Sequence, residues 1–188
     1  MSNASLPPFT AEGLLPVGDY ALTFTELRRS HLVTGAGNLS STWDTPWRET
    51  LTDNLETMAE QLWAVGITRI FVDGSFVEDK DHPGGIDGYF ECDLAELASG
   101  RLVAALNALD PYQVWTWDGR QRRSSPASVK KQLPMWHQYR VELYPHAPGL
   151  MSGIADEFGN DLEFPAAFRK SRQHRAKGII LLEKGQAL

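Results

Sequence analysis

The sequence contains little cysteine and no long apolar run. Its 188 residues include one cysteine, Cys92, which excludes an intramolecular disulfide and a multi-cysteine zinc cage. No segment approaches the roughly 18 consecutive apolar residues of a transmembrane helix. The first residues also lack the basic and apolar regions of a secretory signal peptide. We therefore expect a cytoplasmic protein that has no membrane partner.

Several catalytic patterns are also missing. The sequence has no P-loop, no Gly-x-Gly-x-x-Gly and no Ser/His/Asp arrangement of a known order. Its five histidines show no metal-ligand spacing. These absences direct the search for a functional site toward carboxylates and basic side chains.

Charge is distributed unevenly along the chain. Residues 1–119 hold 18 acidic and 6 basic residues, whereas residues 120–188 hold 6 acidic and 12 basic residues. The net charges are therefore −12 and +6. Either carboxylates for a metal face cations for phosphates, or the two parts pair with each other and bind nothing. The basic runs at 120–131 and 169–177 have the same two interpretations, solvated surface or phosphate contact.

Hydrophobic periodicity predicts a helix over about 46–65, with one apolar face made of Trp47, Leu51, Leu55, Met58 and Leu62. We expect strands at 67–72, 86–92, 112–117, 139–144 and 179–182, and further helices at 25–33, 93–109, 128–136 and 164–173. Residues 145–163 are expected to form a loop. The interleaved pattern predicts an α/β or α+β fold with a mixed sheet flanked by helices.

The segment 66–93 has the clearest chemical pattern. A strand ends in Asp73-Gly74-Ser75, and a second strand bearing Asp87 follows after a polar spacer. Glycine lets the main chain approach phosphate oxygens, and turn N–H groups with the Ser75 hydroxyl can hold a phosphate. Lys80, in the spacer, could also reach a phosphate, although a solvated loop lysine is an equal alternative.

This order of helix, strand, Gly-Ser, spacer and acidic strand resembles the nucleotidyltransferase superfamily, which has the DNA polymerase β-like fold. More narrowly, the chain resembles uncharacterised bacterial proteins of the DUF6932 type. Three stretches carry that narrower resemblance: 73–93, 135–145 and 164–180. On this basis we expect an extended N-terminal arm with a short helix over 1–40 and a nucleotidyltransferase-like domain over 41–188.

The resemblance also implies an activity and its residues. Asp87 and Glu142 would be catalytic and would hold Mg²⁺ or Mn²⁺, while Gly74, Ser75 and Lys80 would bind the nucleotide. The reaction would transfer a nucleoside monophosphate from an NTP to a hydroxyl of RNA, a protein or a small molecule. A toxin–antitoxin or defence setting is implied in the same way.

The sequence departs from the superfamily at one metal ligand. Where the pattern has Asp-apolar-Asp, this chain reads Gly85-Ile86-Asp87. Asp73, Asp79 or Asp81 could supply the missing carboxylate. The alternative is a catalytically degenerate protein that binds nucleotide, nucleic acid or a partner protein. A third interpretation is dimerisation through the divided charge. The sequence leaves both enzyme activity and oligomeric state open.

Overall fold

The computed structural model describes residues 6–37, 40 and 42–185, and its centre is a five-stranded mixed sheet. The strand order is β1 (Asp19–Leu22), β9 (Ile179–Leu182), β2 (Ile70–Asp73), β3 (Ile86–Glu91) and β6 (Val141–His146). The β1/β9 and β3/β6 pairs are parallel, whereas β2 is antiparallel to both of its neighbours. This arrangement confirms the predicted fold class.

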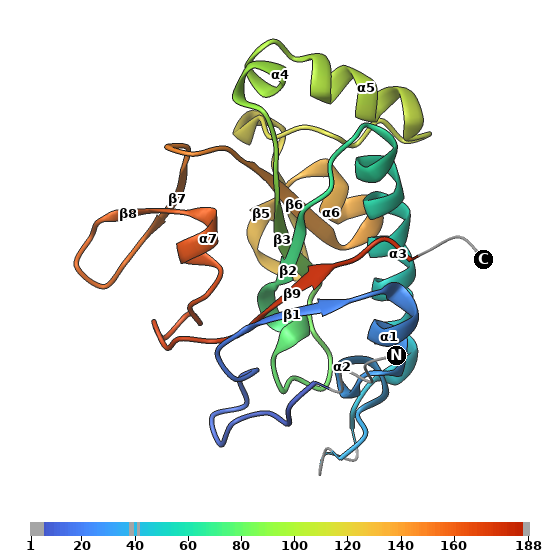
Figure 1. Cartoon of the computed structure of the whole chain (residues 1–188), viewed down its shortest axis with the longest axis vertical. Coiled ribbons are helices and arrows are strands. Elements are labelled where there is room, and N and C mark those ends of the chain that lie inside the picture. Colours follow the sequence, from blue (N-terminus) through green and yellow to red (C-terminus); the bar gives the residue numbers. More distant parts are fainter. Residues whose placement is uncertain (1–5, 38–39, 41, 186–188) are drawn as a thin grey trace.

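Helices and two small hairpins surround the sheet (Figure 1). The helices are α1 (Phe24–Arg29), α2 (His31–Thr34), α3 (Thr45–Ala64), α4 (Leu94–Ala98), α5 (Arg101–Leu109), α6 (Pro134–Tyr139) and α7 (Phe164–Ala167). Two 3-10 turns are η1 (Gly74–Val77) and η2 (Gly119–Gln121). One hairpin joins β4 (Arg123–Ser125) to β5 (Ser128–Gln132), and the other joins β7 (Met151–Ala155) to β8 (Asp161–Glu163).

Helix α3 forms where its apolar periodicity predicts it. Leu51, Leu55, Met58 and Leu62 are fully buried, and burial of each such side chain stabilises the fold by about 1.5–3 kcal/mol. The helix begins after Asp44, whose side chain accepts a hydrogen bond from the Trp47 N–H. Asp44 is therefore the N-cap of α3.

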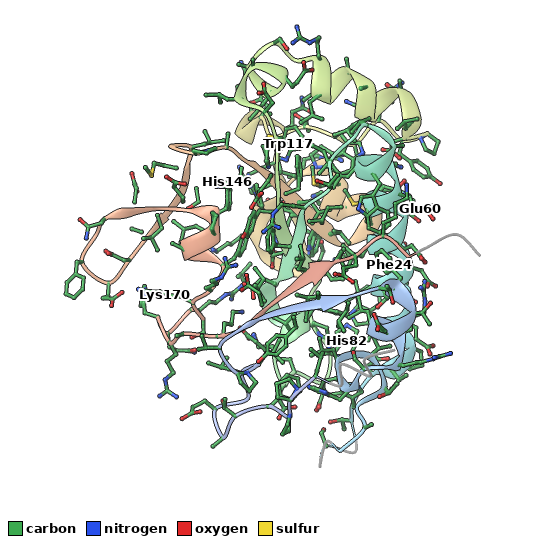
Figure 2. The ribbon with its side chains drawn as sticks, viewed as in Figure 1. Phe24, Glu60, His82, Trp117, His146 and Lys170 are labelled. Carbon is green, nitrogen blue, oxygen red and sulfur yellow. The ribbon has the colours of Figure 1, made fainter. Side chains whose placement is uncertain are left out.

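The two faces of the sheet have different character. Strand side chains alternate between faces, and Ile70, Val72 and Phe90 belong to the main core with the apolar stripe of α3. The opposite face carries a smaller cluster that includes Phe71 and Tyr89, packed against residues of α7 and its flank. His146, at the end of β6, is on this second face, where Nε2 lies 3.6 Å from Glu163 Oε2 (Figure 2).

Several predicted elements differ in the structure. No strand forms at 112–117, because the Asn107 side chain hydrogen-bonds both the N–H and the C=O of Trp115 in place of a neighbouring strand. The helix predicted at 128–136 is instead strand β5 followed by α6, since Pro134 begins a helix rather than interrupting one. The expected loop 145–163 contains the β7–β8 hairpin.

Two predicted helices, near the start and near the end of the chain, are shorter or divided in the structure. The helix expected over 164–173 ends at Ala167. The helix expected over 25–33 is divided at Ser30 into α1 and α2. Strand β1, within residues 1–40, pairs in parallel with β9 at one edge of the sheet.

Candidate functional site

Three carboxylates lie side by side on the adjacent strands β2, β3 and β6. Asp73 at the end of β2 is the direct partner of Asp87 on β3, and Asp87 is the direct partner of Glu142 on β6. Directly opposed residues project their side chains from the same face. We call these three residues the carboxylate row. It contains Asp87 and Glu142, the two predicted metal ligands, and it adds Asp73 beside Asp87.

The turn after β2 lies directly against this row. Gly74 has φ +77°, a conformation that residues with a Cβ rarely adopt. A Cβ at this position would lie 2.5 Å from Asp87 Oδ2. Position 74 therefore requires glycine for two independent reasons. The structure thus brings the predicted Gly74-Ser75 turn, which opens η1, next to the carboxylate row.

Lys177, just before β9, supplies a buried cation to the same region. Its side chain is 2% exposed, and Nζ lies 2.9 Å from Asp73 Oδ1 and 2.9 Å from Glu78 Oε1. Nζ also donates to the Gly74 carbonyl oxygen at 3.4 Å. Local sequence gave no reason to separate Lys177 from the other cations of 169–177. The signal that could have found it is the acidic–basic division of the chain.

Burial raises the pKa values of two members of the row. The pKa of Asp73 rises to about 7 because burial outweighs the nearby Lys177 ammonium. Burial and the adjacent Glu142 raise the pKa of Asp87 to about 6, against the opposing effects of Arg172, Lys177 and Lys130. Burial disfavours the Lys177 charge, yet Asp73 and Glu78 hold its pKa above the usual value. Cations from the basic part of the chain, residues 120–188, therefore act on the carboxylate row.

Glu142 is fixed by partners on both oxygens and is 2% exposed. Oε1 accepts a hydrogen bond of 2.6 Å from the Leu133 N–H and lies 3.4 Å from Arg122 Nη1. The Tyr144 hydroxyl donates to Oε2, and Arg122 Nη2 donates to the same hydroxyl at 2.9 Å. These contacts orient Glu142 through the start of α6 and through its own strand.

Two further positions from the sequence analysis are Lys80, a predicted nucleotide-binding residue, and Gly85, where a metal ligand is missing. Lys80 Nζ lies 2.8 Å from Glu78 Oε2, so Lys80 is joined to the site through the carboxylate that also holds Lys177. At Gly85, a Cβ would lie 2.5 Å from the Arg140 carbonyl oxygen and 2.8 Å from Trp136 Nε1. A carboxylate cannot be introduced at position 85 without moving α6 or the main chain.

The side chains present do not fit a preformed magnesium site. Among the residues that the structure describes, no group of three His, Cys, Asp or Glu side chains is arranged to hold a metal ion. The contacts explain why, because Asp73 faces an ammonium group and both Glu142 oxygens are engaged. Two surface hollows of about 430 and 490 Å³ lie elsewhere, one beside Trp63 and the other beside Cys92.

Residues 7–183 match DUF6932, a family of unknown function, and the chain belongs to this family. This membership confirms the narrower of the two resemblances, while the nucleotidyltransferase superfamily stays a prediction. No curated protein and no solved structure matches the chain significantly. In the part of the chain that the structure describes, no helix combines the length and apolar character needed to cross a bilayer.

Proposed function

We propose that the chain is a nucleotide-binding protein of nucleotidyltransferase-like type, whose site is the carboxylate row and the Gly74-Ser75 turn. The observation that carries this proposal is the contact between that turn and Asp87. Lys130 and Arg172 both act on Asp87 electrostatically from the basic half of the chain. Turn N–H groups and converging cations are the groups that recognise phosphates.

A compact nucleotide suits this site better than an extended nucleic acid. Several cations of the two basic runs are already paired with acids outside the carboxylate row. Arg120 lies 2.7 Å from Asp118, and Arg169 lies 2.7 Å from Asp19. Such local pairing reduces the positive charge available to follow a nucleic acid backbone. Three other cations, Arg172, Lys177 and Lys130, instead act electrostatically on the same carboxylate, Asp87.

Transfer of a nucleoside monophosphate to a hydroxyl is the second candidate function. It is favoured by one observation, the placement of Asp73 opposite Asp87, which supplies a carboxylate neighbour that Gly85 does not. In this reaction the acceptor oxygen would attack the α-phosphorus of an NTP and pyrophosphate would leave. Asp87, with a pKa of about 6, is suited to accept the hydroxyl proton near neutral pH. We favour nucleotide binding without catalysis, because both Glu142 oxygens already accept hydrogen bonds and Asp73 is paired with Lys177.

Calorimetric titration with ATP, GTP, CTP and UTP, each with and without Mg²⁺, tests the binding proposal. We expect one of the four to bind, and Lys130→Ala and Arg172→Ala to weaken its affinity at least tenfold. The matched controls are Lys131→Ala, on the adjacent position of the same strand, and Arg175→Ala. These should change affinity less than about twofold. Absence of binding by every nucleotide, or equal losses in the controls, would contradict the proposal.

Release of pyrophosphate from the bound nucleotide distinguishes the two functions. Candidate acceptors of the three classes, RNA, protein and small molecule, would be tested with wild type and Asp87→Asn. Transfer predicts release that depends on the acceptor and is lost in Asp87→Asn. Binding without catalysis predicts no release with any acceptor while the calorimetric affinity persists.

A further inference from the structure

The Lys177 ammonium group lies among oxygen atoms of the kind that bind divalent cations. Its Nζ is approached from 2.9 Å by one oxygen each of Asp73 and Glu78, with the Gly74 carbonyl oxygen as a third neighbour. Carboxylate and carbonyl oxygens are the ligands that hard divalent cations take in proteins. The donor atoms therefore resemble those of a cation site, but the cation that they surround is a covalent part of the chain.

We infer that the Lys177 ammonium replaces a divalent cation between Asp73 and Glu78, so that the chain binds its nucleotide without metal. Nucleotide binding without metal rests on the proposed function, whereas replacement of a divalent cation by Lys177 concerns the chain alone. Because the Lys177 side chain is 2% exposed, no ion can enter between these carboxylates while it is in place. The lysine blocks the position as well as neutralising it.

A single ammonium group satisfies the hydrogen-bonding capacity of these carboxylates only in part. Asp73 Oδ1 is buried and receives no hydrogen bond of good geometry, although the Lys177 ammonium is 2.9 Å away. A buried carboxylate oxygen in this condition is costly unless a cation compensates for it. Removal of the ammonium would therefore leave the buried Asp73 carboxylate and the half-buried Glu78 carboxylate, which a divalent ion can bridge.

Replacement of Lys177 by a smaller neutral residue tests this inference with Mn²⁺ as the probe. We expect Lys177→Ala to bind one Mn²⁺ per chain in calorimetry, with the loss of the free-ion electron paramagnetic resonance signal. Wild type and Lys177→Arg, which retains the charge, should bind at least a hundredfold more weakly. Lys170→Ala is the matched control, because Lys170 is an ion-paired lysine on the segment before β9 and joins Glu157 instead (Figure 2).

Two results would overturn the inference: stoichiometric Mn²⁺ binding by wild type, or a folded Lys177→Ala that binds none. If Lys177→Ala is unfolded without metal, circular dichroism is used to measure whether Mn²⁺ restores its fold. Folding on addition of Mn²⁺ supports the inference, and failure of both Lys177→Ala and Lys177→Met to fold in Mn²⁺ contradicts it. Nucleotide titrations of wild type in EDTA are separate, so failure of the proposed function is recognised independently of the Mn²⁺ result.

Discussion

Among the residues that the structure describes, two cations are buried, Arg48 and Lys177, and they have different partners. Arg48 on α3 is fully buried, and its guanidinium donates to four main-chain carbonyl oxygens: those of Leu32, Phe76, Glu78 and Lys80. Lys177 instead faces two carboxylates. The carbonyls that hold Arg48 are neutral and fix the course of the main chain. The groups that hold Lys177 are ionisable carboxylates, and one of them, Asp73, belongs to the carboxylate row.

The surroundings of Arg48 explain its structural role. Its guanidinium lies 3.8 Å from the centre of the Trp43 ring and 5.3 Å from that of Phe76. Burial lowers the pKa of Arg48 to about 9, so it keeps its charge at neutral pH. Arg48 thereby connects α2, η1 and the spacer after η1 to the central helix. It positions the loop that carries Glu78, whereas Lys177 neutralises that loop's carboxylate.

Loss of Arg48 should give the largest effect on stability. Arg48→Ala removes the donor for four carbonyl oxygens at once, and we expect a loss of about 3–5 kcal/mol in the free energy of unfolding. Arg48→Met should be nearly as damaging, because filling the space does not satisfy the carbonyls. Urea unfolding measures both. Arg101→Ala, which removes an exposed ion pair with Glu96, is the control and should leave the free energy of unfolding almost unchanged. An Arg48→Met protein of wild-type stability would refute the structural role.

Lys177 should be replaceable when its partners change with it, which distinguishes it from Arg48. Lys177→Met alone leaves Asp73 buried without a cation and leaves Glu78 with only the exposed Lys80, and it should cost about 2–4 kcal/mol. Addition of Asp73→Asn should recover part of that loss, with a coupling energy of about 1–3 kcal/mol in a double-mutant cycle. No equivalent second substitution exists for Arg48, since main-chain carbonyls cannot be mutated. Additive effects of Lys177→Met and Asp73→Asn would show that the two residues are not coupled.

The two cations also show how far the sequence could predict this molecule. The apolar stripe of α3 is a local pattern, and it predicted the helix correctly. Arg48 lies between the stripe positions Trp47 and Leu51, where a charged residue is usually taken as exposed. Its burial depends on carbonyls that are supplied by α2 and by residues about 30 positions further along the chain. No local pattern records such contacts.

The candidate site was predictable in part. The sequence placed Asp87 and Glu142 on separate strands, and strand pairing makes them direct neighbours. Asp73 was one of three acids considered as a substitute for the carboxylate missing at Gly85. Sequence could not select it, because the choice depends on the register of β2 against β3. Lys177 was missed because its burial depends on Asp73 and Glu78, which are about a hundred residues away.

Asp87 should make the stability of the protein depend on pH in an unusual direction. Its pKa is raised from 3.8 to about 6, so the folded state resists ionisation and wild-type stability falls as pH rises from about 4 through 6. Asp87→Asn lacks this penalty. We expect it to be more stable than wild type by about 1–3 kcal/mol at pH 7.5 and equally stable below about pH 4.

Urea unfolding at these two pH values measures the effect of Asp87→Asn. The control is Asp161→Asn, an exposed acid on β8, which should stay within about 0.5 kcal/mol of wild type at both. If Asp87→Asn is destabilising at pH 7.5, the Asp87 carboxylate has stabilising partners that outweigh its burial.

Lys80 gives the smallest effect and the most direct comparison, because it shares Glu78 with Lys177. Lys177 Nζ contacts Oε1 and Lys80 Nζ contacts Oε2, at 2.9 and 2.8 Å, but the Lys80 side chain is 48% exposed. Water and salt screen an exposed pair, so Lys80→Ala should cost less than about 1 kcal/mol, and the cost should disappear in 1 M NaCl. The loss caused by Lys177→Met should persist in that salt, since solvent ions do not reach a side chain that is 2% exposed. Equal losses for the two lysines, or equal sensitivity to salt, would show that burial does not decide what each ion pair contributes.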